Sequence, residues 1–140
     1  MYAPINQYQN TQITTASPEG ILLMLYEGAV RFSRTALDRM NRGDISGKGI
    51  YIGKTIAIVN ELTCTLNHDV GGEIADNLDR LYAYLISEFS NANINNDSKA
   101  LENAITILSN LCDTWTEAVE AVKKERCAGR GVEQQVRVAG

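Results

Sequence analysis

The sequence has few of the residues from which metal sites and nucleophilic sites are built. It holds one histidine, His68, and three cysteines, Cys64, Cys112 and Cys127, with no CxxC spacing. A di-metal site in a helical bundle needs a Glu-x-x-His repeat on two helices, which one histidine cannot supply. A zinc site needs paired cysteine or histidine ligands. We therefore expect no metal and no cofactor, and free, buried thiols.

Signals for nucleotide, nucleic-acid and membrane binding are also missing. The chain contains neither GxGxxG nor GxxxxGK[ST]. A net charge of −4 and a pI near 5.0 argue against a nucleic-acid partner. No apolar run reaches the roughly 18 residues that span a bilayer, and the opening MYAPINQYQN lacks the basic and apolar regions of a signal peptide. We expect a cytoplasmic protein without nucleic-acid partner or membrane insertion.

The single histidine leaves one catalytic alternative, a phosphorelay through a helical bundle. His68 stands in the stretch NHDVGG, where Asp69 would oppose a phosphoryl group by like charge. No serine or cysteine is positioned beside it for a nucleophilic triad. We expect no enzymatic activity and keep the phosphorelay at His68 as the alternative function.

Four amphipathic segments dominate the chain. Ser17 and Pro18 fit the N-cap and first position of a helix, and Glu19 adds charge that suits its positive end. The spacing of apolar residues predicts helices over about 18–42, within 45–67, over 73–93, and from an N-cap at Asp97 to about 125. No strand-like alternation precedes residue 126. The expected fold is all-α, an antiparallel up-down-up-down four-helix bundle.

The domain organisation follows from the same pattern. Residues 1–16 are polar and predict a flexible N-terminal arm, residues 17–125 form the bundle, and residues 126–140 predict a mobile, disordered tail. Gly28 inside the first helix indicates a close approach by another backbone. Gly47, Gly49 and Gly53 predict a weak start for the second helix.

The apolar stripes of the second and third helices are wide. They cover about 160° and about 140° of the helix circumference, whereas a core-facing stripe needs little over ~100°. A wide stripe either faces two neighbouring helices or leaves an apolar groove for a partner helix. Asn60, Asn77 and Asn91, at the stripe edges, would supply a polar rim for such a groove. A third possibility is a bundle that buries the excess in a symmetric homo-oligomer.

Several longer motifs resemble those of a known family. They are TASPEGILLMLYEGAVRF over 15–32, IVNELTCTLNHDVGGEIADNLDRLYAYL over 58–85, ANINND over 92–97, and a tryptophan late in the last helix, Trp115. Across about Tyr8–Lys123 the sequence resembles the FliS family of flagellar secretion chaperones. The resemblance implies the bundle fold and a binding function without catalysis.

The resemblance also implies the partners. Flagellin's disordered C-terminal segment would wrap around the chaperone as extended chain and short helices and dock in apolar grooves. This prevents premature polymerisation and delivers the subunit to the type III export gate at the membrane. A segment bearing Tyr8 would cover part of the groove until the client displaces it. The chaperone itself is expected to be a monomer or weak dimer.

The resemblance makes Tyr8 of the arm a predicted partner-binding residue. The other predicted partner-binding residues flank the core seam of the bundle, and they are Ile52, Ile56, Asn60, Asn77, Tyr82 and Tyr84. Leu78, Leu108 and Trp115 are assigned to the core.

Overall fold

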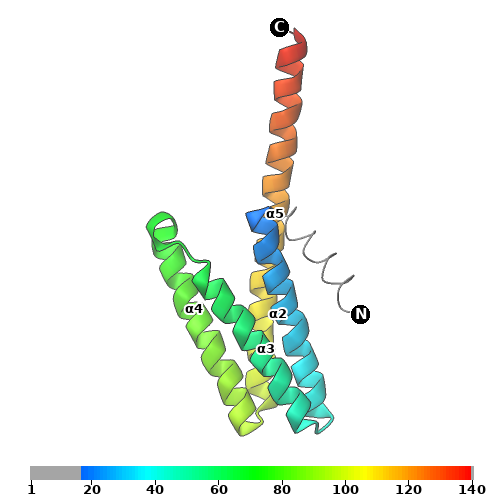
Figure 1. Cartoon of the computed structure of the whole chain (residues 1–140), viewed down its shortest axis with the longest axis vertical. Helices are drawn as coiled ribbons and strands as arrows, with labels where there is room; N and C mark the ends of the chain where they lie inside the picture. The colour runs from blue at the N-terminus through cyan, green and yellow to red at the C-terminus, as the bar shows by residue number, and fades with distance from the viewer. Residues whose placement is uncertain (1–16, 140) are drawn as a thin grey trace, which may run out of the picture. The chain divides into compact units, whose positions relative to one another are not determined.

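A computed structural model describes the backbone of residues 17–139 and the side chains of residues 17–129. It contains the helices α2 (Pro18–Asn41), α3 (Ile45–Cys64), α4 (His68–Asn95) and α5 (Ser98–Ala139), and no strand within 17–139 (Figure 1). The predicted all-α, antiparallel four-helix bundle is confirmed. Tyr8 and the predicted arm lie outside the described residues.

Side-chain caps start the helices. The Ser17 hydroxyl accepts a hydrogen bond from the amide of Gly20 at 3.2 Å, and Asp97 accepts from two amides at the start of α5 at 3.0 and 3.1 Å. Both predicted N-caps are confirmed. Asp44 caps α3 and Asn67 caps α4 in the same manner, and these two were not identified from the sequence.

The connections between helices are too short to allow anything except antiparallel neighbours. The chain reverses over residues 42–44, 65–67 and 96–97. Gly43 and Asn96 take the left-handed backbone conformation, with φ of 77° and 50°. Consequently α3 and α4 run side by side in opposite directions (Figure 1).

The bundle core belongs to a compact unit of residues Met24–Cys112. Its largest fully buried side chains come from all four helices, and they are Ser33, Ile52, Thr55, Val59, Leu62, Leu85, Phe89, Leu101 and Leu108. Leu108 is thus a core residue as predicted, whereas Leu78 is only half-buried. Gly28 is buried, and a Cβ there would meet the Cδ1 atom of Ile58 at 3.4 Å, so a side chain, and not the backbone that was expected, lies nearest to it.

A second compact unit contains, among the described residues, 17–23 and 113–139. The indole Nε1 of Trp115 donates to the backbone oxygen of Glu19 at 3.0 Å, and the Arg126 guanidinium pairs with the Glu19 carboxylate at 2.7 Å. A hydrogen bond from Ser17, the local backbone and the Arg126 charge hold the pKa of Glu19 below its ordinary value. Trp115 is half-buried and is not the core residue that was predicted, because its indole makes this hydrogen bond with the backbone of Glu19.

One charged side chain is buried inside the bundle unit. Lys48 is only 3% exposed, and its Nζ donates to the backbone oxygen of Asn93 at 3.0 Å and to Oδ1 of Asn96 at 3.2 Å. These oxygens lie at the end of α4, where the helix dipole favours a cation. Lys48 therefore fixes the start of α3 against the end of α4.

Three details differ from the sequence predictions. The backbone of α5 continues helically to Ala139, past residue 125 where the apolar pattern stops, because a nucleated helix propagates until a strong breaker intervenes. The mobility of residues 126–140 stays a prediction. Cys64 and Cys127 are free as expected but exposed, since both lie outside the apolar faces of their helices. Gly72 adopts φ 51° and ψ −122° and breaks α4 near its start.

Two glycines with open surroundings should respond to alanine in opposite directions. A Cβ at Gly72 or Gly53 meets nothing within 4 Å, so backbone conformation alone decides the effect. Gly72→Ala should lower the free energy of unfolding by about 1–2 kcal/mol, because its φ and ψ exclude a side chain. Gly53→Ala should raise it by about 1 kcal/mol, because Gly53 is helical. Urea denaturation of both variants provides the measurement, and equal signs would contradict this account.

Candidate partner-binding surfaces

Two of the predicted partner-binding residues lie inside the bundle. Ile52 is 1% exposed and Tyr82 is 2% exposed. The hydroxyl of Tyr82 shares a hydrogen bond with that of Tyr26 on α2, and the two rings pack with centroids 6.5 Å apart. In this structure neither Ile52 nor Tyr82 presents a side chain to a partner, because each lies in the middle of the buried face of its helix.

Burial gives the tyrosine pair unusual acid–base properties. Loss of hydration raises the pKa of Tyr26 well above its ordinary value near 10, and the hydrogen bond with Tyr82 raises it further. Burial also raises the pKa of Tyr82, partly offset by the same hydrogen bond. Both phenols are therefore held in the neutral form within the core.

The other predicted residues on α3 lie at the edge of its buried face. Ile56 is half-buried and Asn60 is exposed. Both lie on the same side of α3 as Gly49. A Cβ atom added to Gly49 would lie 3.8 Å from the side-chain oxygen of Asn93, so this side of α3 faces α4. Ile56 and Asn60 thus border the seam between α3 and α4.

The predicted residues on α4 lie on a different side. Asn77 is exposed and accepts a hydrogen bond from Arg80 at 2.8 Å, while the ring of Tyr84 is 44% exposed. At about 100° per residue, Tyr84 points about 180° away from Asn93, and Asn77 about 160° away. The structure therefore separates the predicted residues into two surfaces, one beside the α3–α4 seam and one on the far side of α4.

Sequence reasoning missed several exposed apolar side chains. The large apolar residues exposed within the described part are Ile45, Ile50, Val70, Ile74, Tyr84 and Ile94. Val70 and Ile74, 85% and 71% exposed, flank the break at Gly72. Ile74 continues the apolar stripe of α4, so periodicity does not distinguish it from the buried members of that stripe. Ile94 lies among asparagines and outside the apolar stripe of α4. This isolation is the one sequence signal that could have identified it as an exposed apolar residue.

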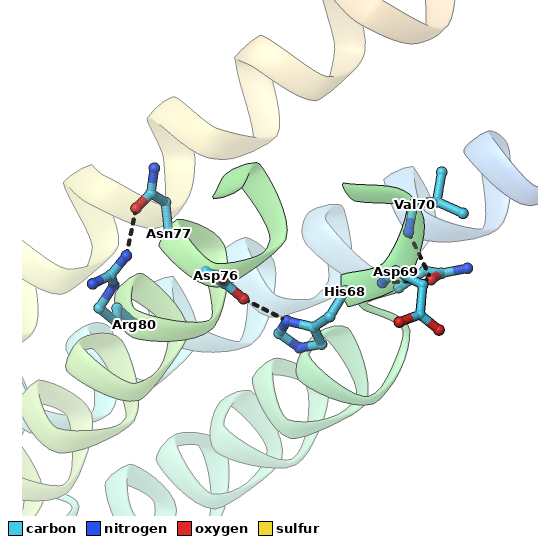
Figure 2. Close-up of polar contacts among 7 residues, drawn as sticks. His68, Asp69, Val70, Asp76, Asn77 and Arg80 are labelled. Atoms are coloured by element: carbon cyan, nitrogen blue, oxygen red, sulfur yellow. Dashed lines mark hydrogen bonds and ion pairs between the residues drawn. The ribbon is translucent and has the colours of Figure 1, made fainter. Parts of the chain in front are cut away.

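His68 lies at the beginning of α4, where carboxylates surround it. Its Nδ1 atom is 2.8 Å from Oδ1 of Asp76 across the Gly72 break, and Asp69 follows it directly (Figure 2). The side chain of Asn67 meanwhile accepts from the amides of Asp69 and Val70. A phosphoryl group on His68 would be repelled by two neighbouring carboxylates. The geometry offers no support for a phosphorelay.

The described residues contain neither a metal-binding cluster nor a membrane-spanning helix. Within residues 17–129, no group of three or more histidine, cysteine, aspartate and glutamate side chains is arranged to hold a metal ion. Among the helices that the structure describes, none has the length and apolarity needed to cross a membrane.

These observations define a class of protein. It is an all-α four-helix bundle that completes its own core and still exposes large isoleucine, valine and tyrosine side chains on α3 and α4. The family model described as "Flagellar protein FliS" matches residues 1–122. The chain therefore belongs to the FliS family of flagellar chaperones.

Named relatives agree. The chain is 36% identical over 121 residues to the flagellar secretion chaperone FliSB of Pseudomonas aeruginosa, covering 82% of this chain and 96% of the relative. It is 30% identical over 129 residues to the flagellar secretion chaperone FliS of Bacillus subtilis, covering 92% and 96% respectively. A solved structure described as a flagellar chaperone from bacteria has the same fold, with a TM-score of 0.69 at 21% identity over 84% of this chain and 98% of that one.

The buried tyrosine pair generates a stability prediction. Tyr82→Phe should lower the free energy of unfolding by about 1–2 kcal/mol, because it leaves the buried Tyr26 hydroxyl without this partner. Replacing both residues with phenylalanine should cost less than the sum of the two single changes. A double-mutant cycle in urea at pH 7 measures the coupling, and simple additivity would contradict a direct hydrogen bond.

The same pair predicts a loss of stability at high pH. The unfolded chain releases tyrosine protons near pH 10, while the folded protein retains those of Tyr26 and Tyr82. Their contribution is therefore fully present below pH 10 and falls as the pH rises above it. The double phenylalanine variant should show a shallower decline in urea midpoint between pH 9 and pH 11 than the wild type.

Proposed function

We propose that this flagellar chaperone binds the C-terminal segment of flagellin on the exposed apolar surfaces of α3 and α4. The observation that carries the proposal is the set of large apolar side chains left outside a closed core, with Ile45, Ile94 and Tyr84 as its clearest members. Single exposed apolar residues are ordinary, but this many on two adjacent helices are typical of an interaction surface.

The energetics suit a client that orders on binding. At ~25 cal/mol per Å2, a partner helix that buries several hundred Å2 of apolar surface gains on the order of 10 kcal/mol gross. Ordering a disordered segment and losing its translational freedom offset a large share of that gain. The net affinity expected is sub-micromolar.

The placement of the candidate residues favours a wrapping client. Ile56 and Asn60 border the α3–α4 seam, whereas Asn77 and Tyr84 face the opposite side of α4. A single straight helix cannot contact both surfaces, since they diverge by about 160–180° around α4. An extended segment with short helices reaches both.

Binding of the client is proposed to serve two purposes, protection from polymerisation and delivery for export. With its C-terminal segment held on the chaperone, flagellin is kept from polymerising and is delivered to the type III export gate. The chaperone acts in the cytoplasm, without catalysis, as a monomer or weak dimer. Tyr8, in the arm outside the described residues, competes with the client for part of the apolar surface.

Isothermal titration with a synthetic peptide of the flagellin C-terminal segment tests the proposal. The wild type should bind with 1:1 stoichiometry, and Ile56→Asp and Tyr84→Asp should each weaken binding at least tenfold, because a carboxylate replaces apolar contact. Asn103→Asp, at an exposed position of α5, is the control for added charge and should bind as the wild type does.

Light scattering separates this function from a symmetric oligomer. The free chaperone should scatter as a monomer or weak dimer. A wild-type protein that fails to retain the peptide, or one that buries its apolar surface in a tight homo-oligomer, would refute the proposal.

A further inference from the structure

Lysine occupies the first buried position of α3. The buried residues of this helix recur at three- or four-residue spacing, and they are Lys48, Ile52, Thr55, Val59 and Leu62. Within residues 45–50, which we call the α3 start, Lys48 is the only fully buried side chain, while Ile45 and Ile50 are 69% and 55% exposed. The α3 start therefore directs a charged group inward and its large apolar groups outward, the reverse of an ordinary amphipathic helix.

The α3 start is also intrinsically weak as a helix. Gly47 and Gly49 lie within it, and Gly53 follows one turn later. Glycine in a helix interior is unfavourable relative to alanine, because it loses more backbone freedom on folding. The Asp44 side chain accepts a hydrogen bond from the amide of Gly47 at 2.9 Å, but this cap joins residues that are neighbours in the chain. The helical form of the α3 start therefore depends on contact with the rest of the bundle.

Lys48 makes that contact with the end of α4. Its Nζ atom donates to the backbone oxygen of Asn93 at 3.0 Å and to Oδ1 of Asn96 at 3.2 Å. Both acceptors are neutral oxygens at the carboxyl end of a helix, where a cation is favoured. Hydrogen bonds from a charged donor are stronger than those between neutral groups, whereas a buried charge without partners is costly. Burial of Lys48 is therefore stable only while these bonds are made.

Apolar contacts hold the next part of α3. The ring of Tyr51 packs on that of Phe32 in α2, with centroids 6.0 Å apart, and Ile52 is 1% exposed. These contacts do not involve the Lys48 ammonium. The change from a polar to an apolar attachment therefore falls between residues 50 and 51.

We propose that Lys48 is a positioning residue whose buried ammonium holds the α3 start against the end of α4. When its two bonds break, residues 45–50 open as a unit while the rest of the bundle stays folded. Local opening of this kind is typical of segments with few buried apolar side chains. Ile45 and Ile50 are displayed on a helix only in the closed form. A consequence for the client, which rests on the proposed function, is that this part of the apolar surface is available only while the α3 start is closed.

Hydrogen exchange of individual amides, measured by NMR on the full chain, tests the opening without any partner. The amides of residues 48–53 donate to the carbonyl oxygens of residues 44–49 and lose these bonds on opening. In the wild type they should exchange faster than the amides of residues 55–62, with little dependence on urea below the unfolding transition. Lys48→Met, which keeps a long side chain without donors, should speed their exchange at least tenfold. Lys99→Met, at an exposed position of α5, should leave it unchanged.

Two further variants separate this role from a general contribution to stability. Val59→Ala should lower the urea midpoint but leave the exchange of residues 48–53 unchanged, because Val59 stays packed when the α3 start opens. Gly49→Ala should slow that exchange about fivefold, since alanine is the better helix former and its Cβ would lie 3.8 Å from the Asn93 oxygen, an ordinary contact. It should do so in the wild type, which keeps a test available if Lys48→Met does not fold, and again in the Lys48→Met background.

Three results would overturn the proposal. They are wild-type exchange that is uniform along α3, exchange that Lys48→Met leaves unchanged, and exchange of residues 48–53 that follows the urea midpoint in Val59→Ala. Each would mean that the α3 start opens only when the whole bundle unfolds.

The consequence for the client has its own readout. A flagellin C-terminal peptide that requires the closed α3 start should slow the exchange of residues 48–53 in the wild type, increasingly as its concentration exceeds the dissociation constant. A peptide that binds and leaves this exchange unchanged refutes the consequence for the client, while the local opening and the chaperone function both stand. If the wild type does not bind the peptide, the proposed function fails and the exchange results without peptide still decide the opening.

Discussion

The closed core between α2, α3, α4 and α5 is the constraint on which the other features of the bundle depend. Phe89, Leu85 and Val59 are completely buried, and the Tyr26–Tyr82 hydrogen bond crosses the same interior. Protein interiors are packed too densely to admit further side chains. Apolar residues beyond the capacity of this core must therefore lie on the surface, which is where Ile45, Ile94 and Tyr84 are found. The apolar character of this surface is thus a consequence of how the core is filled.

Polar side chains at the helix ends determine which residues remain on the surface of the bundle. Asp44 and Asn67 cap the starts of α3 and α4, and buried Lys48 holds the start of α3 against the end of α4. The register that results places Gly49 of α3 beside Asn93 of α4. The break at Gly72 sets the direction of the first turn of α4. Which side chains of α3 and α4 reach the surface is therefore set by local backbone chemistry as much as by apolar residues.

The parts of the structure that follow from neighbouring residues could be predicted. Ser17 and Asp97 were recognised as N-caps, because capping depends on a side chain and amides within three residues of it. The bundle fold followed from four apolar stripes and short turns. By contrast, Ile52 and Tyr82 were placed at the partner surface although they are buried, and Leu78 was assigned to the core although it is only half-buried. Periodicity gives the direction of a side chain about its helix, but whether another helix covers that direction depends on residues distant in sequence.

The sequence by itself determined the helices, their order, the antiparallel connections and the membership of a chaperone family, because these depend on local spacing and on long shared motifs. Only the tertiary structure decided that Lys48 is buried, that Ile56 and Tyr84 face different surfaces, and that Gly49 of α3 lies beside Asn93 of α4. The physical reason is that burial and adjacency are set by the register between helices. That register is fixed by contacts such as Lys48 with Asn93, 45 residues apart in the chain.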